Sequence, residues 1–302
     1  MEAMRYFVSP FLVRWQGVAL ACLWLAAMAT AQEFGRTEIM EISRGLRYTD
    51  GPAWSPAGFL LFADVPNNRL FKYTPGGATN LIRENTGGIS GMAFDKDGRL
   101  FAAESVARRL SKSENDADTV LLKNFEGKAL NAPNDIVVRR NGDILFTDPA
   151  YGTAVEEREL DFHGLFFLSH QGELTVLKRS QTRLSGLALS PDDNTIYVTD
   201  TDQRLVLALV VSKKGEVRNE REFLRVDKGI PTGLCVDTKG NIYVTAERIL
   251  VYDKDGRFLG HYNTPGKPTN CTFGEADGKA LFVTAGGGLY RIQSSVPGLL
   301  PR

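Results

Sequence analysis

Six short side chains that carry oxygen stand at matching places in six related stretches of this chain. They are Asp50, Ser90, Asn134, Ser185, Thr232 and Asn270. Carboxylate, amide and hydroxyl oxygens are the ligands that hard cations such as Ca²⁺ prefer. If the fold brings these residues together, they predict a metal centre. Small polar residues also satisfy backbone groups where strands begin, so a purely structural role stays open at this point.

Each of these residues lies at the start of a repeated phrase. A first apolar strand is followed by a turn and by a second apolar strand that ends near Asp, Glu or Thr. The phrases begin at Gly51, Gly91, Asn134, Gly186, Gly233 and Asn270. A repeat of roughly 40–50 residues built from short strands is typical of a β-propeller. We therefore predict an all-β, six-bladed β-propeller whose first strands surround one central funnel.

The last phrase has only three strands of its own, at Cys271–Phe273, Ala280–Thr284 and Gly288–Ile292. An N-terminal strand, Glu38–Ile42, is predicted to supply the fourth, which closes the ring and removes an open sheet edge. Residues 32–302 are thus expected to form a single propeller domain. The stretch Tyr151–Asp161 is acidic and polar, and it is predicted to be a loop long enough to cover the funnel mouth.

The N-terminal segment has the pattern of a secretory signal peptide. Arg5 and Arg14 flank a short positive region, an apolar stretch runs from Val18 to Ala27, and Ala29-Thr30-Ala31 fits the cleavage rule. The apolar stretch is too short for a typical membrane span. We predict cleavage after residue 31 and an exported protein, periplasmic or secreted, with no membrane attachment; an uncleaved anchor is the alternative.

The charge balance argues against polyanionic partners. The formal net charge is +0 and no block of Lys or Arg stands out, so nucleic acid and anionic membranes are not expected to bind. A small-molecule substrate is expected, and the sequence does not indicate an oligomeric state. Cys235 and Cys271 lie in the apolar first strands of neighbouring repeats. Two buried thiols are expected, although export would permit a disulfide.

Several motifs carry a family resemblance. The stretches DGPAW, PNNRLFKY, GKALNAPNDIVVRRNGDILFTDPAYG and PTNCTFGEADGKALFVTA closely resemble the gluconolactonase-like family, which includes senescence marker protein, gluconolactonase and luciferin-regenerating enzyme. The resemblance runs from about Gly45 to Ile292 and is most specific between Asn131 and Gly152. It implies a six-bladed propeller with one divalent cation, usually calcium, in the funnel. It also implies hydrolysis of sugar lactones and related cyclic esters.

The resemblance implies that Asp50, Asn134, Ser185 and Thr232 hold the cation. Three of them depart from the family pattern, which usually has Glu, Asn and Asp at the places of Asp50, Ser185 and Thr232. Only Asp50 among the four carries a charge, and calcium affinity follows the charge of the ligands. We therefore expect a divalent cation, calcium by the resemblance, that is weakly bound.

The catalytic base is also changed. Thr232 stands where the family has its favoured general base, and a hydroxyl group cannot take a proton near neutral pH. If hydrolysis survives, Asp135 or Asp50 must take that role. Asp135 has a competing structural interpretation, because an Asp at a strand entry often bonds local backbone amides.

Four further residues are expected near the substrate. They are Ser90, Glu104, Tyr151 and Asn270. Glu104 ends a second strand, and simple surface exposure is its alternative. Tyr151 is expected at the funnel border, and packing on the loop is its alternative. The family's Glu-His-Gly-Asn-Arg-Arg stretch keeps Glu104 and both Arg residues here but loses the His and the Asn.

The leading hypothesis is a metal-dependent hydrolase of sugar lactones or related cyclic esters. The alternative is a propeller that has lost hydrolysis and binds a small sugar-like ligand in its funnel, and a third is a scaffold whose rim contacts other proteins. The sequence has no Ser-His-Asp order and no GxSxG elbow, which argues against an esterase with a serine nucleophile.

Overall fold

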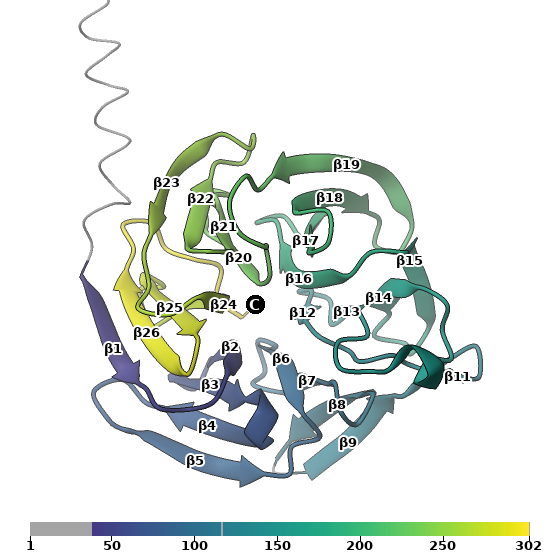
Figure 1. Cartoon of the computed structure of the whole chain (residues 1–302), viewed down its shortest axis with the longest axis horizontal. Helices are drawn as coiled ribbons and strands as arrows, with labels where there is room; N and C mark the ends of the chain where they lie inside the picture. The colour runs from purple at the N-terminus through teal and green to yellow at the C-terminus, as the bar shows by residue number, and fades with distance from the viewer. Residues whose placement is uncertain (1–37, 116, 302) are drawn as a thin grey trace, which may run out of the picture.

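Six four-stranded antiparallel sheets surround a central axis in the computed structural model, which describes residues 38–115 and 117–301 (Figure 1). The predicted all-β, six-bladed propeller is confirmed. The helical segments among the described residues are two 3₁₀ turns, η1 (Val65–Asn67) and η2 (Val155–Glu157). None of the helical segments in this part of the chain has the length and apolarity to cross a membrane. The predicted signal segment, residues 1–31, lies outside the described residues.

The blades follow one another along the chain. Blade 1 comprises β2 (Thr49–Ser55), β3 (Phe59–Asp64), β4 (Arg69–Tyr73) and β5 (Thr79–Glu84). Blade 2 comprises β6 (Ile89–Phe94), β7 (Leu100–Glu104), β8 (Arg109–Glu114) and β9 (Ala117–Leu122). Blade 3 comprises β12 (Ile136–Val138), β13 (Ile144–Asp148), β14 (His163–Leu168) and β15 (Leu174–Ser180). Blade 4 comprises β16 (Leu184–Leu189), β17 (Thr195–Asp200), β18 (Leu205–Val211) and β19 (Val217–Arg225).

The remaining strands complete the ring. Blade 5 comprises β20 (Leu234–Val236), β21 (Ile242–Thr245), β22 (Ile249–Tyr252) and β23 (Phe258–Tyr262). Blade 6 comprises β24 (Pro268–Gly274), β25 (Ala280–Ala285), β26 (Gly288–Gln293) and, as its outer strand, β1 (Ile39–Ser43). β10 (Asn124–Phe125) and β11 (Lys128–Ala129) form a small hairpin between blades 2 and 3.

The two ends of the propeller chain meet in blade 6. β1 pairs antiparallel with β26, with Ile39 opposite Ile292 and Glu41 opposite Tyr290. The sequence predicts this outer strand at Glu38–Ile42, one residue from its place in the structure. The pairing gives β26 a second neighbour in a sheet that would otherwise end there.

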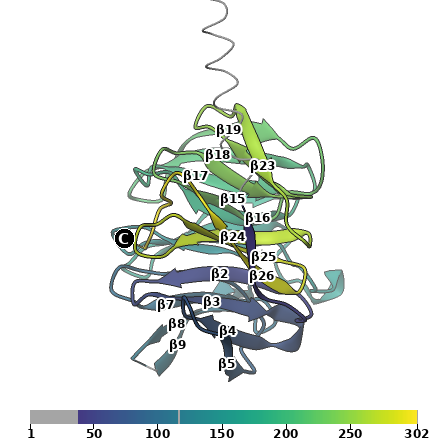
Figure 2. The same ribbon diagram turned by 90° about the vertical axis from the view of Figure 1, so that its left-hand side faces the viewer.

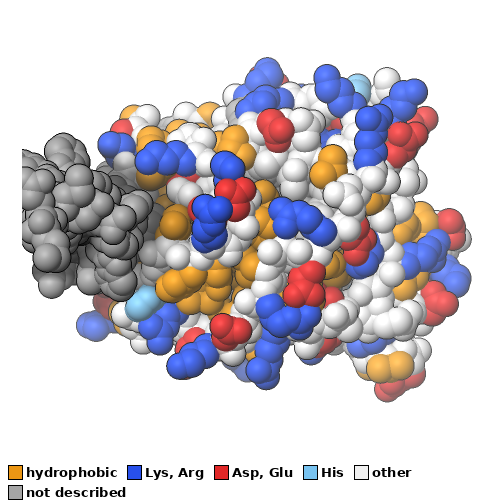
Figure 3. Space-filling view, turned by 90° about the horizontal axis from the view of Figure 1, so that it is seen from above, with side chains coloured by type: hydrophobic (Ala, Val, Ile, Leu, Met, Phe, Trp, Pro, Cys, Tyr) orange, Lys and Arg blue, Asp and Glu red, His pale blue; other side chains and the backbone are white. Residues whose placement is uncertain are grey.

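The hydrophobic core lies between blades, because each sheet buries both faces against its neighbours. Six buried clusters occupy the six boundaries between neighbouring blades in the described structure. Stacked aromatic pairs such as Phe146–Phe166 in blade 3 and Trp54–Phe282 between blades 1 and 6 fill them. Figure 2 shows the sheets from the side. On the face seen in Figure 3, acidic and basic side chains are interspersed.

Glycines let the first strands approach one another closely at the axis. A Cβ atom on Gly186 would lie 2.2 Å from the backbone oxygen of Thr232, and one on Gly51 would lie 2.2 Å from that of Ser90. A Cβ on Gly91 would meet the Asn134 oxygen at 2.4 Å. Real side chains cannot occupy such positions, so glycine after the opening residue is what makes the narrow ring possible.

A belt of hydroxyl groups ties the blades together around the axis. We call it the hydroxyl belt, and it consists of Ser90, Thr147, Thr199, Thr245 and Thr269. Each hydroxyl donates to a backbone carbonyl of the next blade: Ser90 to Asn134 (2.8 Å), Thr147 to Ser185 (2.6 Å), Thr199 to Thr232 (2.6 Å), Thr245 to Thr269 (2.9 Å) and Thr269 to Thr49 (2.7 Å). The belt therefore crosses five of the six blade boundaries.

The C-terminal residues lie on the axis (Figure 1). The Leu299 N–H donates to the Val236 carbonyl at 3.1 Å, and Thr238 donates to Pro297 at 2.8 Å. Leu299, Leu300 and Pro301 line an axial cavity of about 160 Å³ together with residues of the first strands. The C-terminal tail thus borders the axial cavity.

The close approach at Gly186 generates a stability prediction. Gly186→Ala places a methyl group against backbone atoms of the next blade, which have little room to shift, so we expect a loss of about 1–3 kcal/mol in the free energy of unfolding. Urea denaturation measures it. Gly77→Ala is the matched control, because its Cβ would lie 3.3 Å from its nearest neighbour in an exposed turn. Equal stability of the two variants would contradict the packing account.

Candidate functional site

The fold gathers the six opening residues around one axis. Asp50, Ser90, Ser185 and Asn270 lie within the first strands β2, β6, β16 and β24. Asn134 and Thr232 lie two residues before β12 and β20. Contacts between blades join them: the Ser185 hydroxyl donates to Asn134 Oδ1 at 2.9 Å, and Ser90 bonds the Asn134 backbone. The convergence expected from the repeat is therefore present.

Ser185 and Thr232 are hydrogen-bonded within the ring. The Ser185 proton is directed to the side-chain oxygen of Asn134. Thr232 donates to the Thr269 carbonyl at 2.8 Å and lies 3.0 Å from the Thr245 hydroxyl. Both hydroxyl groups keep lone pairs that can face a cation, but they present neutral dipoles there.

Asp50 is the one carboxylate among the six opening residues. It is half-buried, and its Oδ1 accepts the Gly51 N–H at 2.8 Å. Burial raises the pKa of Asp50 to about 7, against the opposing Gly51 bond, and the negative charge of Asp135 adds to the rise. Two carboxyl groups therefore share the axial region, and each disfavours the charge of the other.

Asp135 is buried and firmly held. Its Oδ1 accepts the Ile136 N–H at 3.0 Å, and its Oδ2 accepts the Leu187 N–H from blade 4 at 2.8 Å. The side chain of Asn270, from blade 6, also bonds it. Burial raises the pKa of Asp135 to about 6 despite these bonds. Asp135 thus bridges blades 3, 4 and 6, and its role as a base stays a prediction.

Asp135 and Asn270 lie at the axial cavity. Both line the axial cavity, whereas Asp50, Asn134, Ser185 and Thr232 do not. The Asn270 Oδ1 also accepts the Cys271 N–H at 2.8 Å. The bridge between blades 3 and 6 therefore borders the cavity, whereas the four predicted cation ligands do not line it.

A further buried carboxylate supports the strand entry of blade 3. The Asp148 oxygens accept the N–H groups of Asn131 at 2.7 Å and Ala132 at 2.6 Å. Burial raises the pKa of Asp148 to about 6. This carboxylate fixes the segment that leads into Asn134, which is the most specific stretch of the sequence motif.

The predicted substrate residues differ in their surroundings. Ser90 is buried and donates to the backbone of blade 3. Glu104 is buried and accepts a hydrogen bond from Arg109 Nε at 2.6 Å. Tyr151 is half-buried, and its hydroxyl donates to Thr201 Oγ1 at 3.0 Å. Tyr151 differs from Ser90 and Glu104 because part of its aromatic side chain is open to solvent. Its hydroxyl reaches from blade 3 to blade 4.

The loop that begins at Tyr151 is fastened toward the small β10–β11 hairpin. Glu159 accepts the Ala129 N–H at 2.8 Å, and Thr153 donates to the Asn131 carbonyl at 3.1 Å. Arg108 reaches the Glu157 carbonyl at 3.3 Å. Among the described residues, the contacts of this loop lie with blades 2 and 3, and only Tyr151 extends to blade 4.

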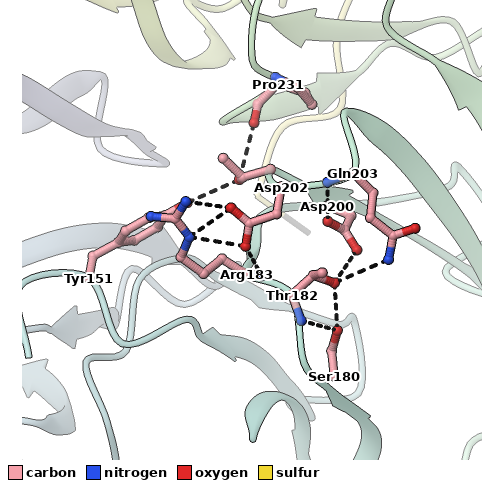
Figure 4. Close-up of polar contacts among 9 residues, drawn as sticks. Tyr151, Ser180, Thr182, Arg183, Asp200, Asp202, Gln203 and Pro231 are labelled. Atoms are coloured by element: carbon pink, nitrogen blue, oxygen red, sulfur yellow. Dashed lines mark hydrogen bonds and ion pairs between the residues drawn. The ribbon is translucent and has the colours of Figure 1, made fainter. Parts of the chain in front are cut away.

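The rim contains residues that the sequence motifs do not single out. Figure 4 shows Arg183 paired with Asp202, with the Arg183 guanidinium 5.2 Å from the centre of the Tyr151 ring. Tyr48 is 41% exposed, and burial of its hydroxyl together with the nearby charge of Asp50 raises its pKa. Tyr48 lies two residues before Asp50, and Arg183 lies two residues before Ser185. This shared place before an opening residue is the sequence signal that could have identified both.

The donor set fits a weakly held hard cation. All four positions present oxygen, Asp50 is a carboxylate with an uncommitted oxygen among the described residues, and Asp135 adds a nearby negative charge. A cation would oppose the burial and the negative charge of Asp135 that together raise the pKa of Asp50. The described residues contain no group of three His, Cys, Asp or Glu side chains that could hold a metal.

Comparisons with known proteins agree on the family. Residues 48–287 match the model of the SMP-30/Gluconolactonase/LRE-like region. A gluconolactonase of Zymomonas mobilis is 32% identical over 87% of this chain and 83% of its own length. The structure of a gluconolactonase from Xanthomonas campestris is 31% identical, with a TM-score of 0.82 over 89% of this chain and 93% of that one.

A more distant structure shares the fold. Regucalcin from Agrobacterium tumefaciens, described as a calcium-binding protein, is 19% identical with a TM-score of 0.72, over 89% of this chain and 98% of that one. The family model covers most of the chain, and the gluconolactonase relatives extend over nearly all of the propeller. The chain therefore belongs to the SMP-30/gluconolactonase/LRE-like family, which includes sugar-lactone hydrolases.

Proposed function

We propose that this chain hydrolyses sugar lactones or related cyclic esters at the opening-residue ring of its funnel, after export from the cytoplasm. Its gluconolactonase relatives support the substrate class. The observation that carries the proposal is Asp50, a half-buried carboxylate in the ring whose Oδ1 alone is engaged, by the Gly51 N–H, among the described contacts.

Asp50 is the group that accepts the proton of the attacking water. Its second carboxylate oxygen accepts no hydrogen bond among the described contacts, and Asp50 belongs to the same set of opening residues as Asn134 and Ser185, which hydrogen-bond each other. Asp135 is held by two backbone N–H groups and by Asn270, so it contributes negative charge and rigidity beneath the ring. A carboxylate within hydrogen-bond reach of a water molecule can act as the general base for such a step.

Asp50, Asn134, Ser185 and Thr232 would hold a divalent cation, which supplies polarisation of the lactone carbonyl when it is bound. Calcium suits the all-oxygen donors. The neutral hydroxyl groups of Ser185 and Thr232 leave this site with less negative charge than the family pattern provides, so the proposed binding is weak.

The rim positions the substrate. Tyr48 precedes β2 of blade 1 and Tyr151 follows β13 of blade 3, and the charge of Tyr151 contributes to the raised pKa of Tyr48. Aromatic faces exclude water from the ring below. The Arg183–Asp202 pair fixes Tyr151 on the blade 4 side of the mouth.

A second function is favoured by one specific observation. Ser185 and Thr232 direct their protons to Asn134 and to the Thr269 carbonyl, so these two hydroxyl groups have acceptors within the protein. This arrangement suits a propeller that binds a small sugar-like ligand and no longer hydrolyses it. The assay below separates the two functions.

Turnover of lactones tests the proposal directly. A panel of aldonic γ- and δ-lactones, followed by proton release at constant pH, should show turnover that rises with added calcium and falls with a chelator. Asp50→Asn should lower kcat by about 10²–10⁴-fold, because the amide cannot accept the proton. Asp97→Asn, in an exposed turn, is the control that should leave kcat unchanged. No chelator-sensitive turnover of any lactone would favour the ligand-binding alternative.

Restoring charge to the ring should strengthen the cation site. Thr232→Asp combined with Ser185→Asn adds a carboxylate and an amide oxygen, and we expect calcium affinity to rise at least about tenfold, with a parallel gain in turnover. Calorimetric titration measures the affinity. Thr232→Asn with Ser185→Asn has the same shape without the charge and should gain much less. Equal affinity of the two double variants would show that the site is misplaced.

The buried carboxyl groups should make stability depend on pH. Burial raises the pKa values of Asp50, Asp135 and Asp148 to about 6–7, whereas an unfolded Asp titrates near 3.9. Between these values the folded state binds more protons, so this contribution to stability is full below about pH 4 and is lost as the pH rises through 6–7.

In a chelating buffer we therefore expect the urea midpoint to rise as the pH falls from 8 to 5. Asp148→Asn should flatten this dependence, because it removes one of the three titrating groups and leaves the four proposed cation ligands unchanged. A midpoint that falls steadily between pH 8 and 5 would contradict the assigned environments.

A further inference from the structure

Two cysteines from neighbouring blades face each other beside the axis. Cys235 lies in β20 of blade 5 and Cys271 in β24 of blade 6, and their sulfur atoms are 2.7 Å apart. In the structure both are free thiols, 9% and 5% exposed. An S–S bond is about 2.05 Å long, so only a small movement of the two side chains would let the bond form.

The backbone of the two blades fixes this pairing. The Gly233 N–H donates to the Thr269 carbonyl at 2.9 Å, and the Thr245 hydroxyl donates to the same carbonyl. A Cβ on Gly233 would lie 2.2 Å from Asn270 Oδ1, so β20 and β24 are in direct contact. Cys235 lies two residues after Gly233, and Cys271 lies one residue after Asn270. Their sulfur atoms are therefore brought together by rigid strands and not by a mobile loop.

We propose that Cys235 and Cys271 form a disulfide that links blades 5 and 6 when the chain folds in an oxidising environment. Each thiol gives up its hydrogen and one S–S bond forms. The two electrons and two protons pass to a low-molecular-weight disulfide, such as oxidised glutathione, which is reduced to two thiols. The expected export of the chain would place it where such oxidants act.

The surroundings of the pair determine when the bond forms. Burial raises the pKa of the Cys235 thiol, and the neighbouring Cys271 thiol raises it further. The thiolate that attacks in disulfide exchange is therefore scarce in the folded protein. The bond forms during folding, before the blades close over it, and it then resists reductants that do not unfold the chain.

The cross-link acts beside the proposed site without belonging to it. Both cysteines line the axial cavity, as Asp135 and Asn270 do, whereas Asp50 does not. The closed loop spans 36 positions in the sequence. A cross-link of this length limits the freedom of the unfolded chain and stabilises the fold. It also joins blade 6, which carries the closing strand β1, to its neighbour.

Peptide mapping tests the proposal. The full chain is refolded with a mixture of reduced and oxidised glutathione, unfolded, alkylated and digested without reductant. The expected product is one cross-linked peptide pair that contains Cys235 and Cys271 and lacks two hydrogens, with Cys22 resolved separately. Recovery of Cys235 and Cys271 as alkylated thiols after this treatment would overturn the proposal.

Thermal unfolding supplies the second readout. Oxidised protein should unfold roughly 5–10 °C above protein that was reduced while unfolded and then refolded with reductant. Cys235→Ala and Cys271→Ala should each abolish the difference. If these variants do not fold, the peptide map of the unaltered chain still decides. Identical unfolding temperatures of the mapped, cross-linked form and the reduced form would overturn the stabilising role.

Discussion

The hydroxyl belt is the interaction on which the rest of the propeller depends. Its members pass hydrogen bonds from one blade to a backbone carbonyl of the next, at five of the six boundaries. Each bond contributes only about 0.5–1.5 kcal/mol. Their common effect is geometric, because they hold the first strands at the separation that glycines such as Gly186 and Gly233 permit. This separation fixes where the opening residues stand.

The belt explains how the ring tolerates changes of chemistry. Ser185 and Thr232 replace the amide and carboxylate of the family pattern, yet each hydroxyl finds an acceptor within the ring. Buried polar groups that keep their partners do not destabilise the fold. The architecture is therefore insensitive to these substitutions, whereas the charge available to a cation falls with them. Asp50 and the fixed Asp135 are the carboxylates that remain at the centre.

The sequence predicts the architecture well, because the repeat is local and regular. The six phrases predict the blades, and the missing strand of the last phrase predicts the outer strand that the structure has at Ile39–Ser43. The convergence of the opening residues follows from the same regularity. What the sequence leaves open depends on contacts between blades. The Leu187 N–H that holds Asp135, the approach of Cys271 to Cys235 and the position of Tyr48 all arise across blade boundaries.

The most direct test of the account is to locate a cation at the ring. Crystals soaked with a lanthanide, a hard cation that prefers oxygen ligands as calcium does, give its position by anomalous scattering. We predict one peak on the axis at about 2.3–2.6 Å from the carboxylate of Asp50 and from Asn134 Oδ1, with occupancy that rises with concentration. A ring that stays empty while its Ser185–Asn134 hydrogen bond persists, at concentrations that fill other sites, would contradict the account.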